Sequence, residues 1–273
     1  MPLEKRTAEN SVATYAASRI SNKFGRVFLA FILRDMRTRF GRSYISYIVS
    51  VGWPLSHLLV MFGAYVLTHK IAPIGDDPSM FAFTGLAPYI LCLYPARFTA
   101  FAVIQNKPLL QFPIATPIHL IFSRVALECL SALVVFMLFY MMLTLLGVAS
   151  EPSNIYLASA AIAATLYLSI GLGVFGVIIC AYQPFFGVLF VVFLALIMYL
   201  ASGALAPFAL ASGQTTALLS LNPLYNIVGL LRSSYYSSYD QHDYSIYYVI
   251  IVASMFLLMG LLGERVVRGK LRE

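Results

Sequence analysis

Residues 155–181 read IYLASAAIAATLYLSIGLGVFGVIICA and contain no charged side chain. They belong to a longer stretch, 152–231, in which 80 residues include no Asp, Glu, Lys, Arg or His. An apolar run of about 20 residues is long enough to cross the hydrocarbon core of a bilayer as a helix. The whole chain has the same character: 60% of its residues are hydrophobic and 11% are charged, against roughly 25% charged in soluble domains. The composition therefore argues strongly against a water-soluble globular protein.

Six apolar runs are predicted to span the membrane: 45–68, 79–104, 120–147, 155–181, 185–204 and 245–263. With their short connections these runs account for most of the 273 residues, so a soluble catalytic domain of about 100 residues does not fit beside them. We therefore expect an all-α integral membrane protein with six transmembrane helices in one domain.

The distribution of basic residues predicts the orientation of the chain. Nine of the 18 Lys and Arg residues precede residue 44, and four more follow residue 264. The connections 69–78 and 148–154 hold a single Lys between them. Because short loops rich in Lys and Arg stay in the cytoplasm, both termini are predicted to be cytoplasmic, with tails at 1–22 and 266–273.

Residues 205–231, between the fifth and sixth predicted spans, need a different interpretation. They are apolar, but Pro207, Gly213 and Pro223 interrupt them. A seventh crossing here would place the basic C-terminal tail outside the cell, against the positive-inside rule. We therefore predict a broken element that re-enters the membrane from the outer face, with its non-helical backbone covered by protein.

The segment 23–42 is predicted to be an amphipathic helix at the membrane interface. Apolar side chains such as Phe24, Phe28 and Phe31 recur at helical spacing, whereas basic side chains fall mostly on the other side. The alternative is a solvated basic tail, but the apolar stripe is too continuous for one. The basic residues of interest in this helix are Arg34, Arg37 and Arg39.

Polar and aromatic side chains on the first predicted span are candidates for a substrate path. Four of them share one face at i, i+3 or i+4 spacing: Ser46, Ser50, Trp53 and His57. One interpretation is hydrogen bonding between helices together with an interfacial aromatic belt. The other is the wall of a hydrated channel, in which rings with a polar tip suit sugar surfaces. Two further channel candidates are Tyr199 and Arg232.

Arg97 is the one basic residue well inside a predicted span, and an ionisable group at such a position is a functional candidate. Glu128 lies at a comparable depth in the next span. Two interpretations stay open. In one, Arg97 and Glu128 form an ion pair that locks the two helices together. In the other, Arg97 lines a path for an anionic solute.

The cytoplasmic connection 105–117 has the properties of a docking surface. Three prolines, at 108, 113 and 117, restrict its backbone. It carries one basic and several apolar side chains that are predicted to be exposed: Lys107, Leu109, Leu110, Phe112 and Ile114. Exposed apolar side chains on a rigid loop indicate a protein partner.

The sequence contains no motif for chemistry within this chain. It has no Walker A sequence, so we expect neither ATP nor another cofactor to bind here. HExxH and GxSxG motifs are missing too, and the three cysteines lack CxxC spacing. Residues 171–176 match GxGxxG, but inside a predicted span small residues are more typical of close helix packing. Neither a catalytic site, a metal site nor a nucleic-acid partner is expected.

Several motifs, taken together, resemble those of a known family. They are LRDMRTRFG (33–41), FTGLAPY (83–89), NKPLL (106–110) continuing to Arg124, and NPL (222–224) followed by Arg232. In their order and spacing over about 25–265, the chain resembles the permease subunits of type-two ATP-binding-cassette exporters. The motifs RTRFG (37–41) and HLL (57–59) most resemble the branch that exports capsular polysaccharide and O-antigen.

The resemblance implies a set of partners and a location. It implies an inner-membrane homodimer with two cytoplasmic ATPase subunits that bind ATP, so this chain would be a transport subunit and not an enzyme. It implies a channel at the dimer interface for a lipid-linked polysaccharide and, in Gram-negative capsule systems, periplasmic and outer-membrane partners. Residues 45–265 would form the transporter membrane domain, 23–42 its gate helix and 105–117 its coupling loop.

Three alternative functions are kept. An exporter of a small drug or lipid would predict fewer channel aromatics and no basic residue along the path. An intramembrane lipid-modifying enzyme would need His, Asp or Glu clustered near one interface, and the four histidines are scattered. An ion-coupled transporter usually needs intramembrane carboxylates, whereas no Asp lies in a predicted span.

Overall fold

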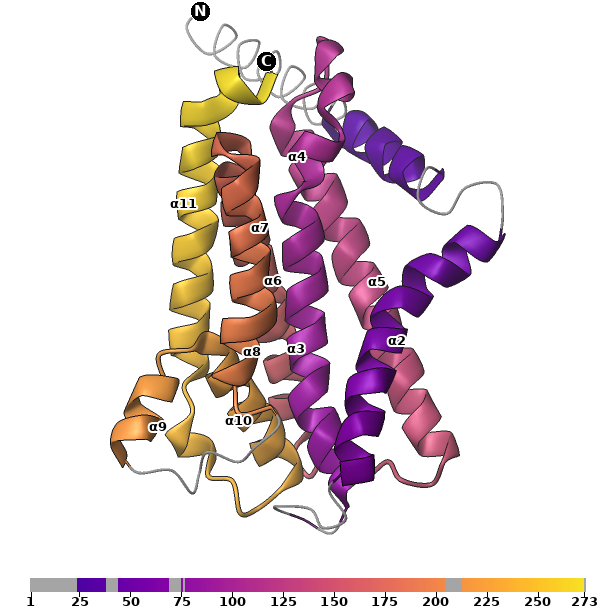
Figure 1. Cartoon of the computed structure of the whole chain (residues 1–273), viewed down its shortest axis with the longest axis vertical. Helices are drawn as coiled ribbons and strands as arrows, with labels where there is room; N and C mark the ends of the chain where they lie inside the picture. Colours follow the sequence, from indigo (N-terminus) through magenta and orange to yellow (C-terminus); the bar gives the residue numbers. More distant parts are fainter. Residues whose placement is uncertain (1–23, 38–43, 69–74, 76, 205–212, 273) are drawn as a thin grey trace, which may run out of the picture.

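The computed structural model describes residues 24–37, 44–68, 75, 77–204 and 213–272 of the chain. In these parts of the chain the regular secondary structure is entirely helical, with no strand. The predicted all-α fold is therefore confirmed. Figure 1 shows that the long helices lie side by side along one axis.

Five helices are long and apolar enough to cross a membrane. They are α2 (Tyr44–Thr68), α3 (Pro78–Ala100), α5 (Pro117–Leu145), α6 (Ile155–Tyr182) and α11 (Ile246–Arg272). Each overlaps one predicted span, because apolar length is a local property of the sequence. Local chemistry also sets several helix starts. The side chains of Asp77, Asn154 and Asn222 each accept a hydrogen bond from a backbone N–H two or three residues ahead.

The fifth predicted span corresponds to a shorter helical run, Pro184–Leu200. It consists of α7 (Pro184–Val192), the π-helical segment η2 (Phe193–Ile197) and α8 (Met198–Leu200). At 1.5 Å per residue this run is about 25 Å long, shorter than the roughly 30 Å hydrocarbon core of a typical bilayer. The count of six crossings therefore stays a prediction.

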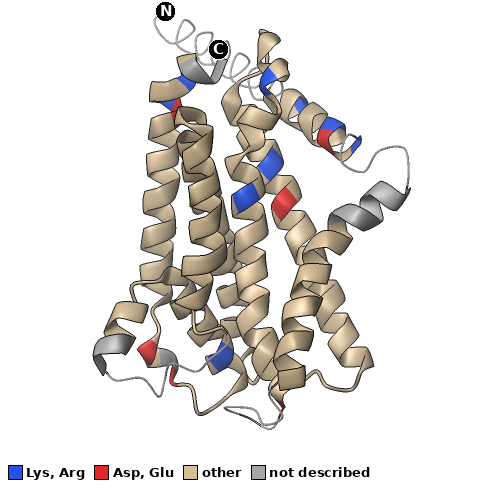
Figure 2. Cartoon of the chain, viewed as in Figure 1, with Lys and Arg blue, Asp and Glu red and all other residues tan. Residues whose placement is uncertain are grey.

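The two ends of the helix bundle differ in their contents. One end carries the N-terminal helix (residues 24–37), the end of α11, and the connection with α4 (Ala102–Gln105) and η1 (Lys107–Gln111). We call it the η1 end. The other carries α9 (Gly213–Leu219) and α10 (Pro223–Tyr235), and we call it the α10 end. Figure 2 shows that most Lys and Arg residues of the described chain gather toward the η1 end.

Helix α3 forms the centre of the fold, because α2, α5, α6 and α10 all pack against it. Glycine makes the closest approaches possible. A Cβ at Gly173 would lie 2.7 Å from the Thr99 Cβ, and one at Gly176 would lie 2.6 Å from the Ala100 Cβ; both neighbours are on α3. A Cβ at Gly171 would collide with the Ala253 carbonyl of α11. The predicted role of the GxGxxG segment in helix packing is therefore confirmed.

The predicted re-entrant element, 205–231, is represented by parts of α9 and α10. Residues 205–212 lie outside the described residues. Helix α10 begins at Pro223, directly after its Asn222 cap, and packs against α3, α6 and α11. Two short helices at the α10 end agree with a broken element, but re-entry into the membrane stays a prediction.

Candidate functional site

The N-terminal helix packs against the start of α5 as well as presenting an apolar surface outward. The ring of Phe24 lies 4.4 Å from the His119 ring, and that of Phe31 lies 6.4 Å from it. On its outer side Leu29 and Leu33 are more than half exposed. A helix at the membrane interface is expected to contact the protein on one side and to expose apolar side chains on another, as this helix does. Of the predicted segment 23–42, residues 23 and 38–42 lie outside the described residues.

A buried cluster of charged side chains joins this helix to α5. The Arg124 guanidinium lies 3.8 Å from the Asp35 carboxylate of the N-terminal helix and 3.6 Å from the Glu128 carboxylate, one turn further along α5. All three side chains are at most 10% exposed. Arg124 also donates to Gln105 Oε1 at 3.1 Å. The interpretation that paired Arg97 with Glu128 was wrong, because Arg124 takes Glu128 as its partner.

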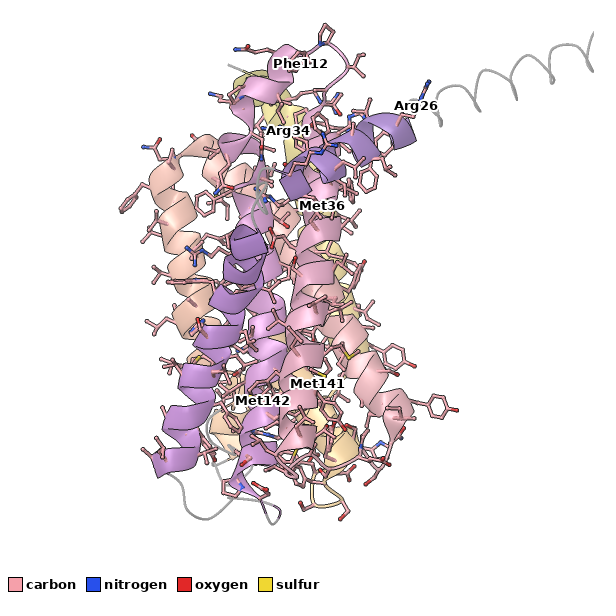
Figure 3. All side chains as sticks on the ribbon, turned by 90° about the vertical axis from the view of Figure 1, so that its right-hand side faces the viewer. Arg26, Arg34, Met36, Phe112, Met141 and Met142 are labelled. Atoms are coloured by element: carbon pink, nitrogen blue, oxygen red, sulfur yellow. The ribbon has the colours of Figure 1, made fainter. Side chains whose placement is uncertain are left out.

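The N-terminal helix also contacts the connection that carries η1. Arg34 Nη1 donates to Asn106 Oδ1 at 3.0 Å, and Asn106 directly precedes η1 as its cap residue. Figure 3 shows Arg34 on the N-terminal helix below the loop that carries Phe112. Arg37 is exposed at the end of this helix, and Arg39 lies outside the described residues. This hydrogen bond joins the N-terminal helix to the start of the η1 connection.

The loop 105–117 presents a smaller apolar surface than its sequence suggests. Phe112 is 64% exposed and Ile114 is 68% exposed, and Lys107 is exposed beside them. Leu109 is half-buried. Leu110 is 8% exposed and packs in a cluster with Val103, Leu120 and Ile121. The expectation of an exposed Leu110 was wrong, because its side chain fills the core beneath η1.

Aromatic side chains connect α2, α3 and α8 in the middle of the bundle. His57 Nδ1 lies 3.1 Å from the Tyr94 hydroxyl, and the His57 ring meets the Tyr89 ring edge-on at 6.3 Å. The Tyr89 ring lies 4.3 Å from that of Tyr199. The Tyr89 hydroxyl donates to the carbonyl of Ala195 at 2.9 Å, within the π-helical segment, where the backbone pattern is irregular.

Two side chains of this region are open to the surroundings. Trp53 is 65% exposed on α2. Arg97 is exposed on α3, and its guanidinium lies 5.7 Å from the centre of the neighbouring Phe98 ring. Ser46 and Ser50 belong to α2, but their side chains lie outside what the structure describes. Tyr199 is 7% exposed and so lies behind this surface.

Arg232 lies in the interior rather than on an open surface. It is 2% exposed, and its guanidinium donates to the carbonyls of Gly203 and Ala204 at 2.7 and 2.8 Å. The guanidinium also stacks 3.8 Å from the centre of the Phe81 ring. Burial lowers the pKa of Arg232 and Tyr239 opposes this, but an arginine stays protonated. The sequence placed Arg232 among the channel candidates, whereas in the structure its guanidinium holds α10 against α3 and the turn that follows α8.

No family model matches the chain. The polysialic acid transport protein KpsM of Escherichia coli is 25% identical over 233 residues, which cover 85% of this chain and 90% of the relative. The capsule polysaccharide export inner-membrane protein BexB of Haemophilus influenzae is 24% identical over 241 residues, 87% of this chain and 89% of the relative. The chain is a homologue of these two polysaccharide transport proteins.

The homology covers nearly the full length of both chains, so it extends to the bundle as a whole. It confirms the resemblance drawn from the motifs around the N-terminal helix, the 105–117 loop and α10. It also favours a transport protein over the lipid-modifying enzyme, because these homologues are named for transport and export. Within the described ranges, no group of three or more His, Cys, Asp or Glu side chains could hold a metal ion.

Some residues that the structure brings together were given no role of their own on the basis of the sequence. Asp35 and Arg124 form the buried charge cluster, and Tyr89 and Tyr94 form the aromatic contacts behind His57. The spacing of Arg124 and Glu128 by four residues is a signal that could have identified their pairing. No comparable signal exists for Asp35, since its partner lies 89 residues away in the chain.

Proposed function

We propose that this chain is the membrane subunit of an ATP-binding-cassette exporter that moves a capsular polysaccharide out of the cytoplasm. The observation that carries the proposal is the homology to two capsule-transport proteins over at least 85% of the chain. Five apolar helices and a central buried α3 support a membrane permease. The names of both homologues refer to a polysaccharide, and this favours a polymer over a small drug as the substrate.

In this proposal, two copies of the chain form the channel between them. Helix α2 supports a dimer, because only 22% of the residues in its apolar stretch Val51–Thr68 are buried within one copy. The polymer path would be lined by Arg97 and by the α2 face that carries Trp53 and His57. Tyr199 would lie behind this lining.

A lipid-linked polymer needs room for an alkyl chain as well as for sugar. A cavity of about 380 Å³ opens between α6, the η2–α8 segment and α11, with Phe193, Val252 and Phe256 among its mostly apolar lining residues. Such a lining suits the alkyl part of a lipid anchor.

The energy for transport would come from two ATPase subunits docked at the η1 end. The sequence contains no phosphate-binding loop, so ATP must be bound by another chain. Phe112 and Ile114 offer apolar anchors there, and Lys107 and Arg37 offer charges around them. Periplasmic and outer-membrane export proteins would receive the polymer at the α10 end. Membrane lipids would contact Leu29 and Leu33 of the N-terminal helix.

The proposal is tested by complementation of a capsule-producing strain that lacks its own export permease. Co-expression of this chain with its cognate ATPase should move polymer from the cytoplasm to the cell surface, measured by antibody labelling before and after permeabilisation. An ATPase variant without its catalytic glutamate is the control and should leave the polymer inside. Polymer retained inside by a correctly inserted, ATPase-bound permease would contradict the proposal. Changed drug sensitivity in the same strain would then favour a small-molecule exporter.

The proposed orientation gives a separate prediction. Single cysteines at Glu151 and Asp240, both exposed at the α10 end, should react with a membrane-impermeant maleimide in intact cells. Cysteines at Lys107 and Arg265, both exposed at the η1 end, should react only after permeabilisation. The reason is that basic loops stay in the cytoplasm. Labelling at Arg265 in intact cells would contradict a cytoplasmic C-terminus.

A further inference from the structure

Arg97 is the one exposed residue of α3. In the apolar stretch of this helix, 94% of the residues are buried. A charged side chain within a membrane span is costly unless it faces a partner or a hydrated path. Among the residues that the structure describes, no carboxylate lies within ion-pair distance of Arg97. Glu128, which lies at a comparable depth on the next span, pairs with Arg124 instead, as does Asp35. The guanidinium of Arg97 is therefore available to a ligand.

Trp53 lies at the same level of the bundle as Arg97. The contact of His57 with Tyr94 fixes α2 and α3 relative to one another. The two helices are antiparallel (Figure 1), so Trp53 lies about 6 Å from His57 toward the η1 end, and Arg97 lies about 4.5 Å from Tyr94 toward the same end. Helix α2 diverges from α3 in that direction, which leaves Trp53 exposed although it shares a face with His57.

We infer that Trp53 and Arg97 together form a contact site for carboxylated sugars of the transported polymer. An indole can pack against the apolar C–H face of a sugar ring. A guanidinium can bind a carboxylate through two parallel hydrogen bonds, which an ammonium group does not reproduce. The site would make the permease sensitive to the charge of the polymer. This inference rests on the proposed export of a polysaccharide and adds the residues that recognise its acidic groups.

The binding test uses the single tryptophan of the chain as its reporter. The full chain in lipid nanodiscs is titrated with a short sialic acid oligomer and with the same oligomer after reduction of its carboxylates to alcohols. Wild type should change its tryptophan emission with the acidic oligomer at about tenfold lower concentration than with the reduced one, as expected for a charge-assisted hydrogen bond. Equal midpoints for the two oligomers would overturn the inference.

Substitutions assign the effect to Arg97. Arg97→Gln should bind both oligomers equally, at the midpoint of the reduced one, and Arg97→Lys should recover part of the difference. Arg265→Gln removes the same charge from an exposed position on α11 and should behave as wild type. Preference for the acidic oligomer retained in Arg97→Gln would overturn the inference. The thermal midpoint of each variant shows that the protein is folded.

An export measurement separates failure of this inference from failure of the proposed function. In the complementation strain, producing a carboxylated capsule, Arg97→Gln should lower surface polymer by about tenfold while ATPase binding is unchanged. If wild type restores export and Arg97→Gln equals it in both export and charge preference, the site is wrong but the function holds. If wild type exports nothing, the proposed function fails, whereas the oligomer titration still decides whether Arg97 binds acidic sugars.

Discussion

Arg124→Met is expected to destabilise the folded chain by about 3–5 kcal/mol, because it removes the arginine shared by two buried carboxylates. Asp35 and Glu128 are 7% and 3% exposed, so water cannot replace the lost partner without opening the structure. The substitution also removes the hydrogen bond to Gln105 and the ion pair that joins α5 to Asp35 of the N-terminal helix. The measurement is the thermal midpoint of the purified protein in detergent, read as the fraction that remains monodisperse after heating.

A triple variant gives this prediction its sharpest test. Asp35→Asn, Arg124→Met and Glu128→Gln together remove all three charges while keeping similar side-chain volumes. Because neutral replacements of a buried ion network are often as stable as the original, the triple variant should be more stable than Arg124→Met alone. Arg265→Met, an exposed cation at the same end, is the control and should match wild type. A wild-type midpoint for Arg124→Met would show that the cluster contributes little.

Phe112→Ala combined with Ile114→Ala is expected to weaken ATPase binding by about a hundredfold or more. Each side chain is more than 60% exposed in this chain and would become buried on docking. Burial of such a side chain contributes about 1.5–3 kcal/mol, and 1.4 kcal/mol corresponds to a tenfold change in affinity. The permease should remain folded and inserted, because neither side chain belongs to its core. The measurements are co-purification of the ATPase and polymer at the cell surface.

A matched control is available at the opposite end of the bundle. Ile155 and Tyr156 are 60% and 84% exposed at the start of α6, and Ile155→Ala with Tyr156→Ala makes a comparable change in apolar surface. This control should retain the ATPase. Leu110→Ala is unsuitable, since Leu110 is buried and its loss is expected to cost about 2–5 kcal/mol of stability. Undiminished co-purification with the Phe112 and Ile114 variant would exclude the η1 loop as the docking surface.

The candidate site was partly predictable from the sequence. Phe112 and Ile114 were predicted to be exposed, and this prediction is confirmed. Leu110 has the same chemistry and a neighbouring position, but the turn of η1 directs it inward. The sequence does not show which of these neighbouring apolar side chains is buried, since the direction of a side chain in a loop depends on the helices that pack against the loop.

The sequence by itself determined most helices of this protein, because apolar length, helix caps and charge distribution are local properties. It predicted six spans, five of which correspond to helices long and apolar enough to cross a membrane, and it predicted the concentration of basic residues at one end. Only the tertiary structure decided the partners of the buried charges. Glu128 binds Arg124 rather than Arg97, and Arg232 holds backbone carbonyls inside the fold. The reason is physical: a buried charge binds whichever group the packing of the helices brings within reach, and helices far apart in sequence supply those groups.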